Sequence, residues 1–206
     1  RRNDVADYYL FNHYIDAGRY EEAMLHADAL LRRKFETLGP NIYPKILLAV
    51  RDPALVEALA KRLAKNPEWR GDFLVFANQK YQDSNSVYPI YEAMQKAGAN
   101  PTAAELNPYL RRLLQDERYE QAYLSWIIFL PQSTAARLTN IYDGRFEDWP
   151  ETPPFGWQFG DGRGSIEPAD AYGRPGKALM VNFDGLRLPK LPGQTLILAP
   201  GPYRLT

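Results

Sequence analysis

Apolar residues recur at intervals of three and four through the first two thirds of the chain, and this spacing is typical of amphipathic helices. Short polar links separate the periodic segments. We expect helices over residues 4–17, 20–36, 41–50, 53–65, 67–80, 84–98, 102–115 and 118–130. Because short links force neighbouring helices to pack antiparallel, the pattern predicts an array of helical hairpins.

Three of the links carry residues that begin or end helices. Asp52 and Asn66 each precede a proline, which predicts an N-cap followed by a proline in the first helical turn. Gly98 follows the segment that ends near Lys96 and predicts a C-terminal stop. These signals place helix starts at residues 53 and 67.

An internal repeat accompanies the helical pattern. The stretch YIDAGRYEEA from Tyr14 aligns without a gap to LLQDERYEQA from Leu113, 99 residues later. That distance is three periods of about 33 residues, close to a tetratricopeptide unit. In such a unit a turn residue reverses the chain, a large residue fills the space between two helices and a small one permits close approach. Tyr20 and Tyr119 are the predicted plugs, and the predicted close-approach positions are Ala23 and Ala122.

On these residues the helical part resembles the tetratricopeptide repeat family, which implies an α-solenoid that binds a protein partner. The resemblance departs from the family early in the first helix, where Asp7 and Leu106 replace the usual aromatic residue. Family positions on the concave face imply a groove that grips an extended peptide by its backbone. The candidates are Asn12, Asp16, Arg111 and Gln115. The alternative for each is a solvated surface side chain.

The last third of the chain has a different composition. Ten of the 17 prolines lie from Pro131 onward, and ten of the 14 glycines lie from Gly144 onward. Both residues break helices and form turns, so the architecture changes near residues 131–138. Short apolar runs bounded by glycine and proline predict strands at 178–183 and 194–199, with another beginning at 203–206.

We therefore predict an α+β protein with two domains. Residues 1–133 form an N-terminal α-α superhelix of tetratricopeptide-like repeats, and residues 134–206 form a small antiparallel β-sandwich. About 70 residues are too few for a jelly roll of ~8 strands. We expect the sandwich to be either incomplete in this chain or a reduced variant.

Sequence stretches in the β part are similar to the opening half of galactose-binding-like jelly rolls, a family with many carbohydrate-binding modules. The stretches are YDGRFEDW from Tyr142, FGW from Phe155, GKAL from Gly176 and QTLILAPGPYRL from Gln194. The resemblance implies sugar binding, in which flat aromatic rings stack on the sugar. The candidates are Trp149, Trp157 and Tyr172, and packing between sheets or domains is their alternative. It also implies Glu147 as a structural calcium ligand, with a solvent-facing glutamate as the alternative.

Charge and composition narrow the partners. The chain holds 25 lysines and arginines against 25 aspartates and glutamates, so no net field attracts nucleic acid or an anionic membrane. Residues 91–101 resemble an RNA-binding pentatricopeptide unit, but the neutral charge argues against nucleic acid. The absence of cysteine excludes disulfides and thiolate metal sites. No apolar run approaches ~20 residues, so we expect no membrane insertion by this segment.

Catalytic chemistry finds little support in the sequence. His13 and His26 lie outside metal-binding spacings, and no serine lies in a nucleophile-elbow motif. Carboxylates cluster in the β part, at Asp143, Glu147, Asp148, Glu151 and Asp161. A glycosidase needs two catalytic carboxyl groups ~5–10 Å apart, and spacing along the chain does not show that any two of these carboxylates meet this distance. We expect no cofactor other than the calcium ion that the resemblance implies.

These observations predict a non-enzymatic binding and scaffold protein. Its helical repeats hold a protein partner, and its β module binds carbohydrate, in polysaccharide synthesis or export. A bacterial periplasm or cell envelope is favoured over the cytoplasm. One alternative is a helical scaffold whose β part is only a structural cap, and a less favoured one is a glycoside-processing enzyme.

Overall fold

A computed structural model shows the chain as two compact units, Arg1–Arg112 and Leu113–Thr206. The described residues are 3–80, 84–130, 132–136, 138, 141–146, 154–158, 165–173, 175–183, 185, 192–198 and 200–204. The units divide inside a helix. The predicted domains, 1–133 and 134–206, stay a prediction, because compactness does not show which parts fold independently.

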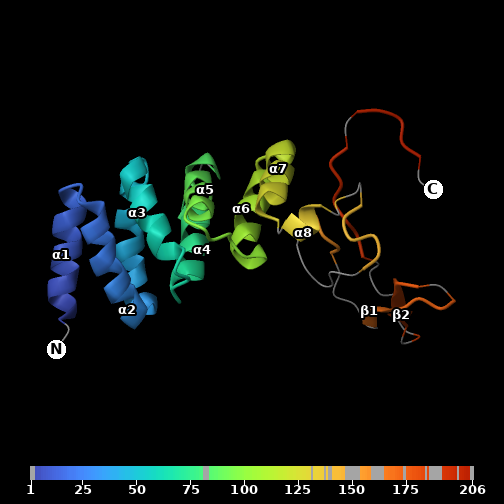
Figure 1. The fold of residues 1–206 in the computed structure, drawn as a ribbon, viewed down its shortest axis with the longest axis horizontal. Helices are drawn as coiled ribbons and strands as arrows, with labels where there is room; N and C mark the ends of the chain where they lie inside the picture. Colours follow the sequence, from blue (N-terminus) through green and yellow to red (C-terminus); the bar gives the residue numbers. More distant parts are fainter. Residues whose placement is uncertain are drawn as a thin grey trace. The chain divides into compact units, whose positions relative to one another are not determined.

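The first unit is helical, and its helices follow one another in chain order in Figure 1. They are α1 (Asp4–Asp16), α2 (Tyr20–Ala49), α3 (Pro53–Leu63), α4 (Arg70–Lys80), the 3-10 turn η1 (Ser84–Ser86), α5 (Tyr88–Lys96) and most of α6 (Ala103–Gln115). Helix α1 packs on α2, α2 packs on α3 and α4, and α3 packs on α5. The predicted helices are confirmed, except for the break within α2, and their limits agree to within four residues.

The predicted break between residues 36 and 41 lies a few residues earlier. Helix α2 consists of two helices that meet at a kink at Lys34, where φ is −154° and ψ is 46°. The second half of α2 buries an apolar face, which outweighs the donors removed by its two internal prolines. Gly39 makes room there, because a Cβ at this position would lie 2.8 Å from the ring of Tyr43. That buried ring packs edge-on against a phenylalanine of α4.

The predicted helix-end signals are confirmed at two of the three links. Asp52 caps α3, with its Oδ1 accepting from the amide of Ala54 at 2.9 Å. Gly98 ends α5 in the left-handed region, with φ 85°. The predicted start at residue 67 is wrong: Asn66 itself takes a left-handed φ of 48° and α4 begins only at Arg70. Asparagine tolerates this conformation, so it turns the chain after α3 instead of capping α4.

The predicted repeat is confirmed as one local turn formed twice. Gly18 and Glu117 occupy equivalent positions between helices and both have a left-handed φ, of 68° and 58°. In each turn the amide of the following arginine donates to the carbonyl five residues earlier, at 2.9 and 2.8 Å. These bonds close the Schellman motif that commonly ends helices. The structure thus repeats the turn, while a tetratricopeptide superhelix is not established by it.

Two side-chain roles predicted for the repeat have different outcomes. Ala23 and Ala122 are fully buried, as the close approach of two helices requires. Tyr119 is 49% exposed, so its predicted role as a plug between helices is wrong. Tyr119 is the first residue of α7 (Tyr119–Phe129), one turn before the buried Ala122.

A buried ion pair joins α4 to α6 within the first unit. Arg70 is only 4% exposed and donates to Glu105 Oε2 at 2.7 Å. The same guanidinium donates to the carbonyl of Leu63, the last residue of α3, at 3.3 Å and to that of Asn100 at 2.8 Å. One side chain therefore links the end of α3, the start of α4 and the chain before α6.

Glu105 extends this network to the start of α6 and to α5. Its carboxylate accepts from the amide of Thr102 at 2.8 Å, and Thr102 Oγ1 accepts from the amide of Glu105 at 3.3 Å, which is a capping box. The hydroxyl of Tyr91 in α5 donates to the carbonyl of Glu105 at 2.8 Å and accepts from Asn78 of α4 at 2.9 Å. Burial raises the pKa of Tyr91, so this hydroxyl keeps its proton.

Aromatic packing holds the second unit together. Trp126 of α7 is 3% exposed, and its ring lies 5.2 Å from Tyr142 and 5.4 Å from Phe155 between centroids. Gln194 fixes the backbone of Tyr142, accepting from its amide at 3.0 Å and donating to its carbonyl at 2.9 Å. Segments far apart in sequence are thereby anchored beside α7. The short helix α8 (Gln132–Ala135) follows α7.

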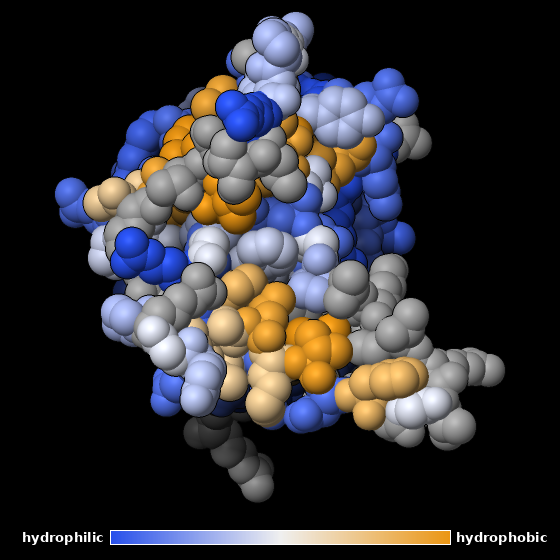
Figure 2. All heavy atoms as spheres, turned by 90° about the vertical axis from the view of Figure 1, so that its right-hand side faces the viewer, coloured by the Kyte–Doolittle hydropathy of each residue, from blue (hydrophilic) through white to orange (hydrophobic). Residues whose placement is uncertain are grey.

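The described sheet has two antiparallel strands, β1 (Ser165–Asp170) and β2 (Lys177–Asn182), with Ile166 opposite Val181. Strand β2 confirms the predicted strand at 178–183, and β1 was not predicted. Apolar side chains gather on the surface of the second unit shown in Figure 2. Exposed apolar residues of β2 include Met180 and Val181.

The other predicted strands are wrong for the residues that the structure describes. Residues 194–198 form no strand, and the nearest pairing is a single bridge between Gly193 and Gln158. Residues 203 and 204 form none either. Leu196 and Leu198 are 40% and 44% exposed, and residues 194–198 line a small cavity together with Tyr142 and Phe155. The helices together with the small antiparallel sheet are consistent with the predicted α+β class, while a β-sandwich is not established for the described residues.

We expect the two equivalent turns to respond oppositely to substitution. Gly18→Ala should lower the free energy of unfolding by about 1 kcal/mol, because a Cβ is strained at left-handed φ although open space surrounds it. Glu117→Gly should raise it by about 1 kcal/mol through relief of the same strain. Urea unfolding followed by circular dichroism measures both. A change of the same sign in both variants would contradict the shared geometry.

Removal of the buried cation should be costly. Arg70→Met leaves the Glu105 carboxylate buried without its partner, so we expect a loss of about 3–5 kcal/mol in the free energy of unfolding. The matched control is Glu92→Gln, which breaks an exposed pair with Lys96 and should cost less than about 0.5 kcal/mol. Equal losses in the two urea titrations would show that the Arg70 network does not anchor the unit.

Candidate functional site

A groove of about 700 Å³ lies between α3 and α5 in the first unit. The buried residues that line it are Val50, Val56 and Ala60. Prolines and alanines form much of the rest of the lining: Pro53, Pro89, Ala93 and Ala97. The groove thus has an apolar lining of short side chains, and its volume lies in the range of roughly 300–1,000 Å³ typical of ligand sites.

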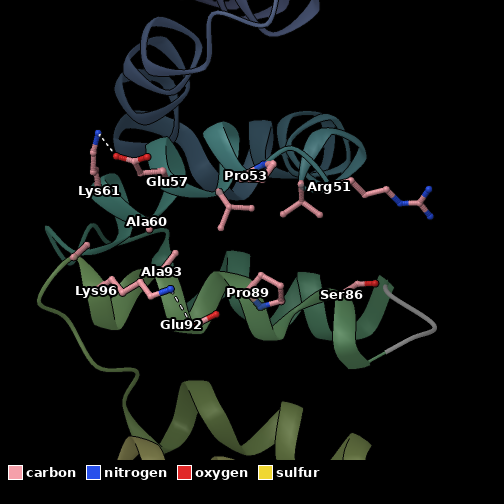
Figure 3. A pocket seen from close by; sticks show the side chains of 13 residues that line it. Arg51, Pro53, Glu57, Ala60, Lys61, Ser86, Pro89, Glu92, Ala93 and Lys96 are labelled. Carbon is pink, nitrogen blue, oxygen red and sulfur yellow. Dashed lines mark ion pairs between the residues drawn. The ribbon is translucent and has the colours of Figure 1, made fainter.

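Two helices running in the same direction form the walls. Figure 3 shows α3 passing from Pro53 to Lys61 and α5 passing from Pro89 to Lys96 across the view. Each helix begins with a proline in its first turn, where the missing amide costs nothing. The two walls are also tied to the buried network, α3 through its last carbonyl and α5 through Tyr91. Their spacing is therefore set by packing behind the groove.

Ion pairs line the rim, one on each wall. Glu57 and Lys61 are 3.0 Å apart on α3, and Glu92 and Lys96 are 2.9 Å apart on α5. Lys61 also lies 2.6 Å from Glu21 of α2. The hydrogen bonds that Lys61 donates to Glu21 and then to Glu57 raise the pKa of Lys61, so it remains an ammonium at neutral pH. Because these pairs are exposed, each contributes little stability and can exchange for a partner's charges.

Arg51 stands at the other end of α3 from Lys61. Its side chain extends away from the groove floor in Figure 3 and makes no ion pair with another described residue. The adjacent Asp52 is engaged in capping α3. One end of the rim therefore carries the Arg51 guanidinium beside the Asp52 carboxylate, and the other end carries three carboxylates, counting Glu21, and two ammonium groups.

None of the residues predicted for a peptide groove lines this groove. Asn12 and Asp16 lie on α1, where Asn12 is half-buried, donates to the carbonyl of Tyr8 at 2.7 Å and accepts from Lys45. Asp16 is exposed. Arg111 and Gln115 are exposed on α6. Their binding role stays a prediction that the structure does not test.

The predicted sugar-binding rings have unequal environments. Trp157 is half-buried: its indole N–H donates to the carbonyl of Asp143 at 2.9 Å, and its ring lies 5.1 Å from that of Phe146. Tyr172 is fully exposed in the turn between β1 and β2. Trp149 lies outside the described residues. Only Tyr172, among the two described rings, presents its faces to solvent.

Few of the candidate carboxylates for metal binding or catalysis lie in the described part of the chain. Glu147, the predicted calcium ligand, lies outside them. No group of three or more histidine, aspartate or glutamate side chains in the described part of the chain is placed to hold a metal ion. His26 lies 2.9 Å from Asp7, and hydrogen bonding to His26 and then to Arg33 lowers the pKa of that carboxyl. This arrangement joins α1 to α2.

No protein-family model, curated protein or solved structure matches this chain. The resemblances to tetratricopeptide repeats and to galactose-binding-like modules therefore stay predictions. Among the described helices, none combines the length and apolar character that a membrane span needs.

Sequence reasoning missed the α3–α5 groove. The only signal along the chain is that both helices combine a Glu-x-x-x-Lys pair with small residues on the groove side, at Ala60, Ala93 and Ala97. Such patterns also occur on ordinary solvated helices. The groove exists because α3 and α5 lie beside each other, although α4 separates them in sequence.

Proposed function

We propose that this chain is a non-enzymatic binding scaffold whose helical unit holds a segment of a partner protein in the α3–α5 groove. The observation that supports the proposal is the open groove with its apolar lining, between two helices braced by buried polar contacts. Apolar surface rimmed by charged residues is typical of interaction sites. A protein-binding helical scaffold is also the function that the sequence pattern favours.

The charges of the groove suit binding rather than chemistry. The rim carboxylates are paired with lysines on their own helices instead of facing each other across the groove. A glycosidase needs two carboxyl groups at a fixed separation on either side of a sugar. The described rim offers paired charges that stabilise a partner's surface and a lining that removes apolar side chains from water.

Filling the groove should abolish binding of peptides. We expect a random peptide library displayed on phage to yield binders of the wild-type protein whose affinity falls at least about tenfold for Ala93→Trp, because the indole occupies the space of a partner side chain. Ala54→Trp is the matched control, since Ala54 is exposed on α3 outside the groove lining. Binders that tolerate Ala93→Trp as well as Ala54→Trp would contradict the proposal, as would a library that yields none.

A carbohydrate-binding role for the β part is a second proposal, favoured by the exposed ring of Tyr172. The ring stands in the turn between β1 and β2, beside an ion pair of 2.9 Å between Asp170 and Lys177. A flat exposed ring next to polar groups is what stacking on a pyranose requires. The polysaccharide assembly and the envelope setting stay predictions.

Sugar binding should depend on the Tyr172 ring. On a glycan array, Tyr172→Ala should remove binding, whereas Tyr172→Phe should keep most of it, because the ring face and not the hydroxyl makes the contact. Trp157→Phe serves as a control, since Trp157 packs on Phe146. Binding that survives Tyr172→Ala, or a wild-type protein that binds no glycan, would leave the β part without this role.

The alternative for the β part, a structural cap, is favoured by the aromatic cluster of the second unit. Tyr142 and Phe155 pack on Trp126 of α7 and are themselves buried. These contacts cover an apolar face of α7 with irregular chain. Capping and sugar binding use different residues, so both roles are compatible with this unit.

A further inference from the structure

We infer that the occupant of the α3–α5 groove is an amphipathic helix of a partner protein, acidic at the end beside Arg51 and basic at the end beside Glu57. The inference rests on the proposed function and narrows its partner to one kind of structure. Three properties of the groove carry it: its lack of free backbone groups, its length and its charge distribution.

The walls offer no backbone edge to an extended peptide. The amides of α3 and α5 bond within their own helices, and even first-turn donors are taken. Asp52 accepts from Ala54 through its side chain at 2.9 Å and from Val56 through its carbonyl at 3.2 Å, and Val87 accepts from Ile90 at 3.0 Å. An extended segment would bury its own amides and carbonyls against an apolar lining, at a cost of several kcal/mol. A helix satisfies them internally.

The length of the groove matches about two turns of such a helix. Pro53 and Lys61 are eight residues apart on α3, which corresponds to roughly 12 Å at ~1.5 Å per residue. Pro89 and Ala97 span a similar length along the other wall. Two or three apolar side chains spaced by three or four residues would enter this space. The short side chains of Ala60 and Ala93 leave room for branched aliphatic groups such as leucine.

The charges give the groove a direction. Arg51, at the start of α3, makes no ion pair with another described residue, and the carboxylate of Asp52 beside it is bonded to the amide of Ala54. At the far end Lys61 is shared between Glu57 and Glu21, which leaves an excess of negative charge. The pair of Glu92 and Lys96 on α5 is balanced. A partner helix is therefore complementary when its acidic end lies beside Arg51 and its basic end beside Glu57.

Synthetic peptides test the charge pattern. Three labelled peptides of about 15 residues, long enough for partial helicity, share one leucine stripe. One is acidic at one end and basic at the other, one is acidic at both ends and one is basic at both ends. By fluorescence anisotropy the first should bind the wild-type chain about two- to fivefold tighter than the others, as expected for exposed charge pairs. Arg51→Glu should shift the preference to the peptide that is basic at both ends, whereas Lys65→Glu, outside the groove, should not.

A further peptide tests the helical conformation. Proline at the centre of the stripe breaks the helix and should weaken binding at least about tenfold. Equal binding of the proline peptide, equal binding of all three charge patterns, or insensitivity to Ala93→Trp would overturn the inference. A dimer of the wild-type chain that Ala93→Trp dissociates in light-scattering chromatography would overturn it in favour of a second copy. If a small apolar dye displaces the peptides and the peptides themselves show no preference among the charge patterns, the inference is wrong and a small molecule is the favoured ligand.

The inference and the proposed function fail differently. If phage-selected binders need the open groove but are non-helical, or carry no acidic residue beside Arg51, the function stands and the inference is wrong. If no binder depends on Ala93, the function itself is wrong.

Discussion

The buried ion pair between Arg70 and Glu105 is the contact on which the helical unit depends. A guanidinium removed from water needs hydrogen bonds within the protein, and here its two terminal nitrogens bond to Leu63, Asn100 and Glu105, while Nε has no partner among the described residues. These partners lie at the end of α3, before α6 and within α6. One desolvated charge thereby fixes the positions of three segments that an apolar core alone would constrain less specifically.

The groove is a consequence of this bracing. Its walls are the two helices that contact the buried network, α3 through Leu63 and α5 through Tyr91. Because they are held from the buried side, the walls keep short side chains facing each other without collapsing to fill the space. Binding to such a preformed surface orders few protein side chains, so less of the interaction energy is lost to conformational entropy.

In the second unit, aromatic packing and not a buried ion pair holds distant segments of the chain together. Outside its helices and two strands, the described part of this unit is irregular, and irregular chain needs side-chain partners to become ordered. Trp126 supplies them through two aromatic contacts, and Gln194 adds a two-way hydrogen bond with the backbone of Tyr142. The exposed Tyr172 lies apart from these contacts, on the turn of the sheet. The aromatic rings that pack thus lie around Trp126, and the ring that faces solvent lies in the turn of the sheet.

Local chemistry was enough to predict the helices, the repeated turn at Gly18 and Glu117 and the strand β2, because these depend on residues near one another in the chain. The break within α2 was predicted a few residues too late, because the second helix continues through its two prolines and buries an apolar face. Strand β1 was missed because Glu167 and Pro168 interrupt its apolar pattern, and residues 194–198 were taken for a strand because apolar runs suit packing as well as pairing. The sequence by itself determined which segments form helices, with ends correct to within four residues apart from the break in α2. Only the tertiary structure decided that α3 and α5 face each other across a groove and that Arg70 meets Glu105, because both depend on contacts between segments more than 25 residues apart, which no local pattern encodes.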